Sequence, residues 1–509
     1  MKWIIVIFSL LAAYFFKNEK VLAGIFVVFS AIMAILPKVE PKKKDQSHIK
    51  DVRKRVVIEI FDQNLGWKIF KNTWLGIFFK KSYKWKEEDA CRHFFITGET
   101  GSGKTAGGAD CIVDGFLNSG TYFGGWNIEF KNDYSYNLEK LFKKYNRFEK
   151  IKVLRAGVDG QEPLWRFDLF HDRSISWRTY VDIIVETAIS LQDGAKDGSN
   201  PFFPESAKQY IEMGFIALDE IQRDAGGSPP NLFHAFETVI NEKFRDAEII
   251  PYLKQIKTEK AQEALRHFES LKEGKARETI ENIEKTVSTY IKFYSDPTMR
   301  SIFCSDNPNC HMGMIDDGTL FSLSVSQKLQ TERRIAMQLL KFFFNLHWLQ
   351  RQDLPREEVD LLLPLVGLYD ECQTTLSPSA VYGDHLMASV ARASRVIFVF
   401  MTQSRNSGLV RMGKEKMNNL AENLCNGFVF RSAVNLDNTI AELDEKYLGD
   451  REVTESEYSY SNMKTSTRRV KKRRPWYKRD LLQCLAVGSC VIKHVEYKND
   501  PKLFNLKHW

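Results

Sequence analysis

Residues 98–105 read Gly-Glu-Thr-Gly-Ser-Gly-Lys-Thr and fit the pattern G-x-x-x-x-G-K-[ST], in which backbone N–H groups surround the phosphates of a nucleotide. Lys104 is expected to reach the β- and γ-phosphates, and the hydroxyl of Thr105 to ligate Mg²⁺. The loop therefore predicts binding of ATP and Mg²⁺; the alternative is an ordinary glycine-rich turn. The predicted nucleotide-binding residues are Gly98, Glu99, Thr100, Gly101, Ser102, Gly103, Lys104 and Thr105.

A second group of residues that could take part in catalysis is a pair of adjacent carboxylates. The stretch 361–371 is strongly hydrophobic and ends in Asp370 and Glu371. A buried strand that delivered Asp370 next to the glycine-rich loop would give the Mg²⁺ an acid in its second coordination shell, and Glu371 would polarise the attacking water. The alternative is a strand that simply ends at a solvated turn. With the loop, the pair predicts hydrolysis of ATP as well as binding.

The elements that must position these residues follow from the hydrophobic pattern. Strands and helices alternate first, then a long run shows apolar residues at helical spacing, and strands resume after it. The expected strands are 93–97, 121–130, 151–154, 319–325, 361–371, 395–401, 426–430 and 485–495. The expected helices are 106–117, 138–145, 206–222, 232–242, 251–272, 276–294 and 331–349.

This pattern predicts an α/β fold with a mainly parallel sheet and an inserted all-α domain. The carboxylates lie so far along the chain from the loop that the helices are most simply placed between two halves of one nucleotide-binding domain. The expected divisions are 1–37 as a membrane hairpin, 38–90 as a basic connector, 91–173 and 303–509 as the nucleotide-binding domain, and 174–302 as the helical insertion.

Composition sets wide bounds. The chain has 509 residues, enough for two or three domains, and its 43% hydrophobic and 27% charged residues are ordinary for a folded protein. A net charge of +8 is weak evidence for an anionic partner. The eight cysteines include no C-x-x-C pair, which argues against a zinc site and favours a reducing compartment for the globular part.

The first residues differ from the rest. Two apolar runs, 3–16 and 21–36, are separated by Lys-Asn-Glu-Lys and followed by a lysine- and arginine-rich segment. The positive-inside rule places that segment in the cytoplasm, which predicts a two-helix transmembrane anchor with both ends cytoplasmic. A cleaved leader is the alternative, but no A-x-A-like site follows the first run.

The tail contains a run of basic residues. Residues 468–474 read Arg-Arg-Val-Lys-Lys-Arg-Arg, and Trp476 and Tyr477 follow. Cations beside aromatic rings suit contacts with nucleic-acid phosphates and bases. A solvated loop is the alternative interpretation, because the preceding segment 452–466 is polar.

In this order, the features resemble the conjugative coupling proteins of the TraG/TraD class, ATPases that link substrates to a type IV secretion channel. The resemblance spans nearly the whole chain and includes the segments 318–325, 392–404 and 421–449. It implies a RecA-like fold, similar to that of the FtsK and HerA DNA pumps, and a homo-hexamer on the cytoplasmic face. One departure lies at 129–133, where Glu-Phe-Lys-Asn-Asp stands in place of the family's Asp-Pro-Lys-Gly-Glu.

The resemblance also implies roles that spacing alone does not assign. Gln403 would sense the γ-phosphate; the alternative is that it caps a strand. Arg392 would enter the neighbouring subunit's site as an arginine finger, with Arg395 and Arg405 as nearby competitors. Arg92 matches a further basic position near the nucleotide, or is a charge at a strand edge.

The leading functional hypothesis is an anchored ring in the bacterial inner membrane, with most of the chain in the cytoplasm. It would hydrolyse ATP to move single-stranded DNA, with a bound relaxase, into a type IV secretion channel. The alternatives are a coupling ATPase for protein effectors and an assembly ATPase of a phage or membrane machine. DNA handling predicts binding that weakens steeply with salt, whereas protein export predicts an apolar groove in the helical insertion.

Overall fold

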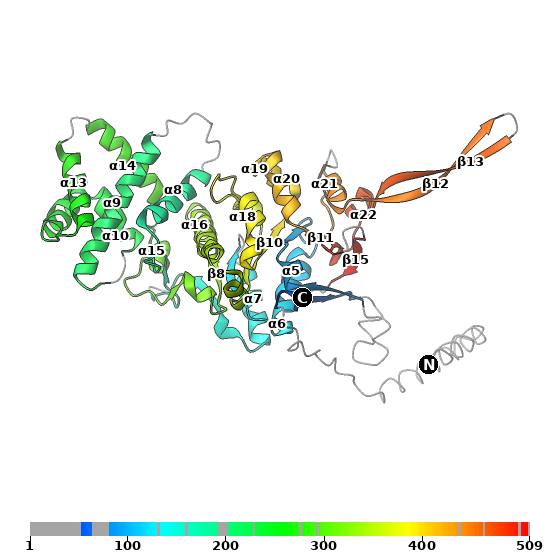
Figure 1. Ribbon diagram of the computed structural model, residues 1–509, viewed down its shortest axis with the longest axis horizontal. Coiled ribbons are helices and arrows are strands. Elements are labelled where there is room, and N and C mark those ends of the chain that lie inside the picture. Colours follow the sequence, from blue (N-terminus) through cyan, green and yellow to red (C-terminus); the bar gives the residue numbers. More distant parts are fainter. Residues whose placement is uncertain are drawn as a thin grey trace.

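The structure is a computed structural model, and Figure 1 shows its course. The residues that it describes are 52–63, 81–129, 133–157, 161–191, 202–227, 230–273, 277–291, 294, 296–435, 439–461, 464–496 and 500–506. The predicted anchor (1–37) lies outside them, as does much of the predicted connector. Within the described ranges, no helix is both long enough and apolar enough to cross a membrane.

Nine strands of the described chain form the central sheet, in the order β15–β14–β11–β3–β10–β9–β4–β8–β5. They are β3 Phe94–Thr97, β4 Gly124–Ile128, β5 Ile151–Arg155, β8 Leu320–Ser324, β9 Leu365–Tyr369, β10 Val396–Thr402, β11 Asn426–Val429, β14 Ser489–Lys493 and β15 Lys502–Asn505. All neighbouring pairs from β11 to β5 are parallel, and β14 and β15 are added antiparallel at one edge. The predicted mainly parallel sheet is confirmed.

The strands at the centre of the sheet are covered on both faces. Every residue of β3, β9 and β10 is buried, which explains why these segments read as continuous hydrophobic runs. Along β10, Phe398 and Phe400 belong to one core, while Ile397 and Val399 belong to the other. This alternation follows from the two-residue period of a strand and fixes which helices cover each face.

Two sets of helices cover the faces. The core on one side contains α6 (Asp110–Ser119) and α7 (Tyr134–Lys144), together with the small antiparallel pair β1 (Val56–Phe61) and β2 (Ser82–Lys86). The core on the other side contains α16 (Gln330–Leu349), whose Trp348 packs edge-on against Phe398. The shorter helices around the sheet are α5 Glu87–Ala90, α17 Arg356–Leu361, α18 Asp384–Val390, α19 Arg405–Met412, α20 Lys414–Asn423, α21 Thr439–Leu448 and α22 Arg479–Gln483.

A separate group of helices comes, in the sequence, between two short strands that pair with each other, β6 (Phe167–Asp168) and β7 (Cys310–His311). They are α8 Trp177–Leu191, α9 Phe202–Asp224, α10 Leu232–Ile240, α11 Glu242–Phe244, α12 Ile250–Leu253, α13 Glu259–Glu273, α14 Arg277–Ile291 and α15 Pro297–Phe303. Figure 1 shows most of them, in green, at one end of the molecule. The single helix expected at 251–272 is wrong: α12 and α13 are separate, and the Thr258 hydroxyl accepts the N–H of Ala261 at the start of α13.

The structure also gives the strand order, which the sequence did not predict, and corrects the interpretation of the tail as a loop. β8, which follows the helical group in the chain, lies between β4 and β5. The polar segment before the basic run and the run itself are not a loop: β12 (Asp450–Ser461) and β13 (Lys464–Pro475) pair antiparallel along their whole length. This two-stranded ribbon projects away from the sheet at the opposite end from the helical group (Figure 1).

The start of β10 is tied to α5 by a buried ion pair. Nε and Nη2 of Arg395 donate to the two carboxylate oxygens of Glu87 at 2.5 and 2.8 Å, and both side chains are buried. Removing the arginine would leave the carboxylate buried without its partner, which costs about 3–5 kcal/mol.

We therefore expect Arg395→Leu to lower the thermal unfolding midpoint by several degrees. Arg392→Leu is the matched control, because Arg392 lies in the same turn and is exposed. Differential scanning fluorimetry of both variants checks the prediction. Equal midpoints for the two variants would contradict it.

Candidate functional site

The glycine-rich loop leaves the carboxyl end of β3 and leads through a π-helical turn, η2 (Lys104–Ala109), into α6. Gly98, Gly101 and Gly103 all have positive φ angles, of 154°, 76° and 98°. At Gly98 the neighbours also exclude a side chain, because a Cβ atom would lie 2.6 Å from Cβ of Phe430. The backbone therefore requires glycine where the sequence pattern places it, and the turn has the geometry that a phosphate cradle needs.

The polar side chains of the loop are held by neighbouring elements. Lys104 is buried, and its Nζ donates to the carbonyl of Glu99 at 3.0 Å. The Glu99 carboxylate pairs with Arg431 just after β11, and its backbone N–H donates to the Arg431 carbonyl at 2.8 Å. Thr105 is half-buried at the start of the helical turn. The Lys104 side chain is thus held against the backbone of its own loop at the end of β3, and the loop is held against the segment after β11.

The acidic pair follows β9 at the same edge of the sheet. Asp370 is buried, and its N–H donates to the carbonyl of Ile128 at the end of β4, at 3.0 Å. Glu371 is also buried and has a left-handed backbone, with φ and ψ both 48°. A non-glycine residue in this region is strained and is often found at functional sites.

Gln403, directly after β10, contacts the predicted water-activating carboxylate. Its Nε2 donates to Oε1 of Glu371 at 3.0 Å. Since β10 lies between β3 and β9, Gln403 stands between the glycine-rich loop and the acidic pair in the strand order. The structure therefore brings Gln403 and Glu371 together, while their roles as γ-phosphate sensor and as water-activating residue stay predictions.

Sequence reasoning missed Gln373. Its Nε2 donates to the other carboxylate oxygen of Glu371 at 2.7 Å, and its Oε1 accepts the hydroxyl of Thr402 at 2.8 Å. Two amide side chains therefore fix the orientation of the Glu371 carboxylate. The only signal in the sequence was proximity, because Gln373 is two residues from Glu371 and a polar residue after an acidic pair is unremarkable.

A second missed residue is Asp444 on α21. Its buried carboxylate accepts hydrogen bonds from Thr97 at the end of β3 (3.0 Å), from Nε of Arg405 at the start of α19 (2.9 Å) and from Ser432 (2.8 Å). These partners join the segment before the loop to the helix after Gln403. No local pattern marks Asp444, because its partners come from three distant segments.

Not every predicted residue lies at this edge. Arg92 precedes β3 and Arg392 precedes β10, whereas the loop and Gln403 follow these strands. A seven-residue strand is about 23 Å long, so within one chain both arginines lie at the opposite edge of the sheet. Arg92 therefore lies at the other end of β3 from the phosphate loop of the same chain, and its role near a nucleotide stays a prediction.

The structure also locates Arg395 and Arg405, the alternatives to Arg392 as the arginine finger. Arg395 is paired with Glu87 and Arg405 with Asp444, and all four side chains are buried. Arg392 is exposed. His93 beside Arg92 serves the fold: its Nδ1 accepts the N–H of Phe398 at 3.1 Å, and burial lowers its pKa to about 4, which keeps it neutral.

Glu129 follows β4, next to the strand that ends at Asp370. Its carboxylate oxygens accept the N–H groups of Tyr134 and Ser135, at 2.7 and 2.9 Å, at the start of α7. Burial raises its pKa to about 7, and the two hydrogen bonds offset only part of that effect. Glu129 stands where the family has its Asp-Pro-Lys-Gly-Glu segment and is used here to cap a helix.

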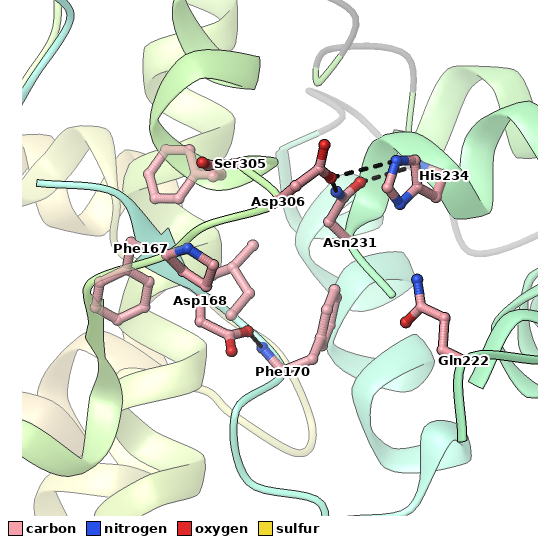
Figure 2. A pocket seen from close by; sticks show the side chains of 11 residues that line it. Phe167, Asp168, Phe170, Gln222, Asn231, His234, Ser305 and Asp306 are labelled. Atoms are coloured by element: carbon pink, nitrogen blue, oxygen red, sulfur yellow. Dashed lines mark hydrogen bonds and ion pairs between the residues drawn. The ribbon is translucent and has the colours of Figure 1, made fainter. Parts of the chain in front are cut away.

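Away from this edge, a cavity of 240 Å³ lies beside the helical group (Figure 2). Asp168 and Phe170 line it from the β6 segment, Asn231 and His234 from the start of α10, and Asp306 from the segment after α15. Asn231 donates to Asp306 at 3.4 Å, and His234 lies 3.5 Å from the same carboxylate. These contacts join the start of α10 to the segment between α15 and β7, and no predicted site residue takes part.

The loop between a parallel strand and a helix, with an acidic pair at the end of a nearby strand, defines a P-loop nucleotide-binding fold. Residues 364–488 match the family described as the TraM recognition site of TraD and TraG. This segment contains the acidic pair, Arg392, Gln403 and the β12–β13 ribbon. No curated protein sequence matches the chain.

Solved structures of a bacterial conjugative coupling protein, TrwB, share the fold. An unbound form has a TM-score of 0.56 at 14% identity, covering 83% of this chain and 86% of that one. TrwB in complex with ADP and Mg²⁺ has a TM-score of 0.56 at 13% identity, covering 83% and 87%. A sulphate complex has a TM-score of 0.56 at 12% identity, covering 89% and 94%. Together, the family match and the fold confirm the resemblance to TraG/TraD-type coupling ATPases.

The raised pKa of Glu129 makes a prediction about stability. Between its ordinary value of 4.5 and about 7, the folded chain keeps a proton that the unfolded chain releases, so this residue lowers stability as pH rises through that window. We expect the free energy of unfolding of Glu129→Gln, relative to that of the unsubstituted chain, to rise by up to about 3 kcal/mol between pH 5 and pH 8. The unfolding midpoint of the variant should rise with it, relative to that of the unsubstituted chain.

Thermal unfolding at a series of pH values, without nucleotide, measures this difference. Glu149→Gln is the control, because Glu149 is exposed and lies on the same side of the sheet, just after α7. A difference between Glu129→Gln and the unsubstituted chain that stays constant with pH would show that the carboxyl does not titrate in this window.

Proposed function

We propose that this chain is a membrane-anchored coupling ATPase that works as a homo-hexamer and moves single-stranded DNA, with its relaxase, into a type IV secretion channel during conjugation. The observation that carries the proposal is the contact between Gln403 and Glu371 at the edge of the sheet where the P-loop lies. The family match over 364–488 supports the coupling role, and it includes both of these residues.

The nucleotide site would be divided among three strands. Lys104 and the loop amides would hold the phosphates, with Thr105 and Asp370 on the Mg²⁺ side. The bound Mg²⁺ would supply neutralisation of charge on the transferred phosphoryl group. Positive φ angles at three loop glycines support this use of the loop, and TrwB, which has the same fold, has been solved with ADP and Mg²⁺.

Glu371 would take a proton from the attacking water, with its carboxylate oriented by the amides of Gln373 and Gln403. Because Gln403 is also the first residue beyond β10, a movement of that strand end changes the position of the carboxylate. Gln403 would in this way couple the state of the γ-phosphate to the base.

Arg392 would complete the site of a neighbouring subunit. It is exposed at the edge of the sheet opposite the P-loop, and the competing Arg395 and Arg405 are held in buried ion pairs. A ring in which the edge of one subunit faces the P-loop of the next would bring Arg392 to the phosphates. Residues 1–37 would hold this ring at the inner membrane.

The first test is ATP turnover by the full chain in detergent or nanodiscs, with and without single-stranded DNA. We expect DNA to stimulate turnover. We expect Glu371→Gln to lower it by about 100- to 10,000-fold, while ATP binding is retained, because only proton transfer is removed. Lys104→Ala is expected to abolish binding as well.

Two results would count against parts of this proposal. Normal turnover by Glu371→Gln would remove Glu371 from the role of base. Turnover that is indifferent to DNA, but lost in Glu371→Gln, would leave the ATPase in place and favour a protein cargo instead.

The second test asks whether Arg392 acts between subunits. Arg392→Ala and Glu371→Gln are mixed as monomers and allowed to assemble. In mixed rings, some interfaces have an intact Glu371 on one side and an intact Arg392 on the other. We expect these interfaces to raise the turnover of the mixture well above the sum of the turnovers of the two variants measured alone. Mixed rings without any gain would show that Arg392 does not act in trans.

A further inference from the structure

The β12–β13 ribbon stands apart from the rest of the fold. Its two strands, Asp450–Ser461 and Lys464–Pro475, pair in an uninterrupted antiparallel register from Asp450↔Pro475 to Ser461↔Lys464. Twelve residues per strand make it about 40 Å long. Figure 1 shows it projecting from the body near α21 and α22, so that most of its surface lies away from the ATPase sheet.

The part of the ribbon nearest the body has two different faces. Directly opposite residues of an antiparallel pair point to the same side, and successive residues alternate. One face therefore carries Arg451, Val453, Glu455, Val470, Lys472 and Arg474. On this face, Arg474 donates hydrogen bonds to the two carboxylate oxygens of Glu455 at 2.9 and 3.1 Å, and Nζ of Lys472 lies 3.5 Å from the same carboxylate. Two of the three cations on this face are therefore already paired.

The other face is a row of cations. It carries Arg469, Lys471 and Arg473 on β13, opposite Ser456, Thr454 and Glu452 on β12, and all six residues are exposed. Lys471 makes a 3.6 Å contact with Glu452, with side chains 77% and 65% exposed. Among the described residues, the structure records no ion pair for Arg469 or Arg473. The row thus keeps its positive charge, with one cation about every 7 Å along the strand.

The side chains of this face favour a phosphate backbone over a protein surface. Arginine, lysine, serine and threonine are among the residues that contact DNA phosphates, whereas the anchors of protein interfaces are mostly tryptophan, tyrosine and arginine side chains in well-packed, desolvated pockets. Between 452 and 456, and between 469 and 473, this face presents no apolar side chain. The family description names a protein recognition site over 364–488, but in these two stretches the face offers no aromatic anchor and no apolar surface around its exposed arginines.

The same composition favours duplex over single-stranded DNA. Proteins that hold single strands stack the bases on aromatic rings, and this face has no aromatic residue between 452 and 456 or between 469 and 473. The major groove of a duplex is about 12 Å wide and admits a two-stranded β-ribbon. Phosphates on both sides of the groove would then lie within reach of the cations.

We propose that the cationic face of the β12–β13 ribbon, formed by Arg469, Lys471 and Arg473, is a docking site for duplex DNA that contacts its phosphates without reading its sequence. This site lies outside the ATPase edge and goes beyond the proposed pumping of a single strand. It holds the duplex from which a single strand is drawn.

The test is binding of a fluorescein-labelled duplex to the full chain in detergent, measured by anisotropy without nucleotide at about 50 and 200 mM salt. We expect Arg469→Thr/Lys471→Thr/Arg473→Thr to bind more weakly and with a shallower salt dependence. Three lost phosphate contacts lower the slope of log K against log salt by about 2.7, so the unsubstituted chain loses about 40-fold more affinity over this range.

The matched control is Arg451→Thr/Lys472→Thr/Arg474→Thr, which removes the same charge from the other face of the same strands. It should keep the salt slope of the unsubstituted chain, and Arg469→Lys/Arg473→Lys should bind normally. Equal weakening by the two triple variants would show a diffuse effect of net charge and overturn the proposal. Unchanged duplex binding in both would overturn it too and point to a protein partner on the ribbon.

A parallel titration with single-stranded DNA separates this site from the proposed ATPase function. We expect the first triple variant to affect the duplex far more than the single strand. An equal loss for both nucleic acids would overturn the preference for duplex. Because the assay needs no hydrolysis, failure of DNA-stimulated turnover leaves its result readable.

Discussion

Backbone hydrogen bonding between β3, β10 and β9 is the constraint on which the candidate site depends. Parallel strands in register must end at the same edge, and here Thr402 pairs with Thr97 while Phe400 pairs with Tyr369. The loop, Gln403 and the acidic pair are the next residues after these ends. Three segments from distant parts of the chain thus become neighbours without any contact of their own having to bring them together.

Buried polar contacts then fix the side chains at that edge. Glu371 is held by two amides, and Asp444 collects three donors from segments around the loop. Inside a protein such bonds are worth more than in water, and an unpaired member would be costly, so each network specifies one arrangement. The strained backbone at Glu371 is retained because this surrounding structure determines it.

The opposite edge of the sheet shows how neighbouring residues of one type acquire different uses. Arg395 directly precedes β10 and forms a buried ion pair with Glu87, which attaches α5 to the sheet. Arg392 is three residues earlier, on the outer side of a short turn, and faces solvent. Type and spacing could not separate them, because the difference is made by Glu87, which lies hundreds of positions away in the sequence.

The sequence by itself determined the features that local chemistry dictates. The glycine pattern required the loop, the hydrophobic run ending in Asp370 and Glu371 required a buried strand with an acidic end, and alternating strands and helices required a mainly parallel sheet. Only the tertiary structure decided the position of β8, the bonds of Gln373 and Asp444, the opposite placement of Arg92, and the ribbon formed by the basic run. The physical reason is that these depend on pairing between distant segments, and a sequence pattern records what a segment prefers but not which partner it meets.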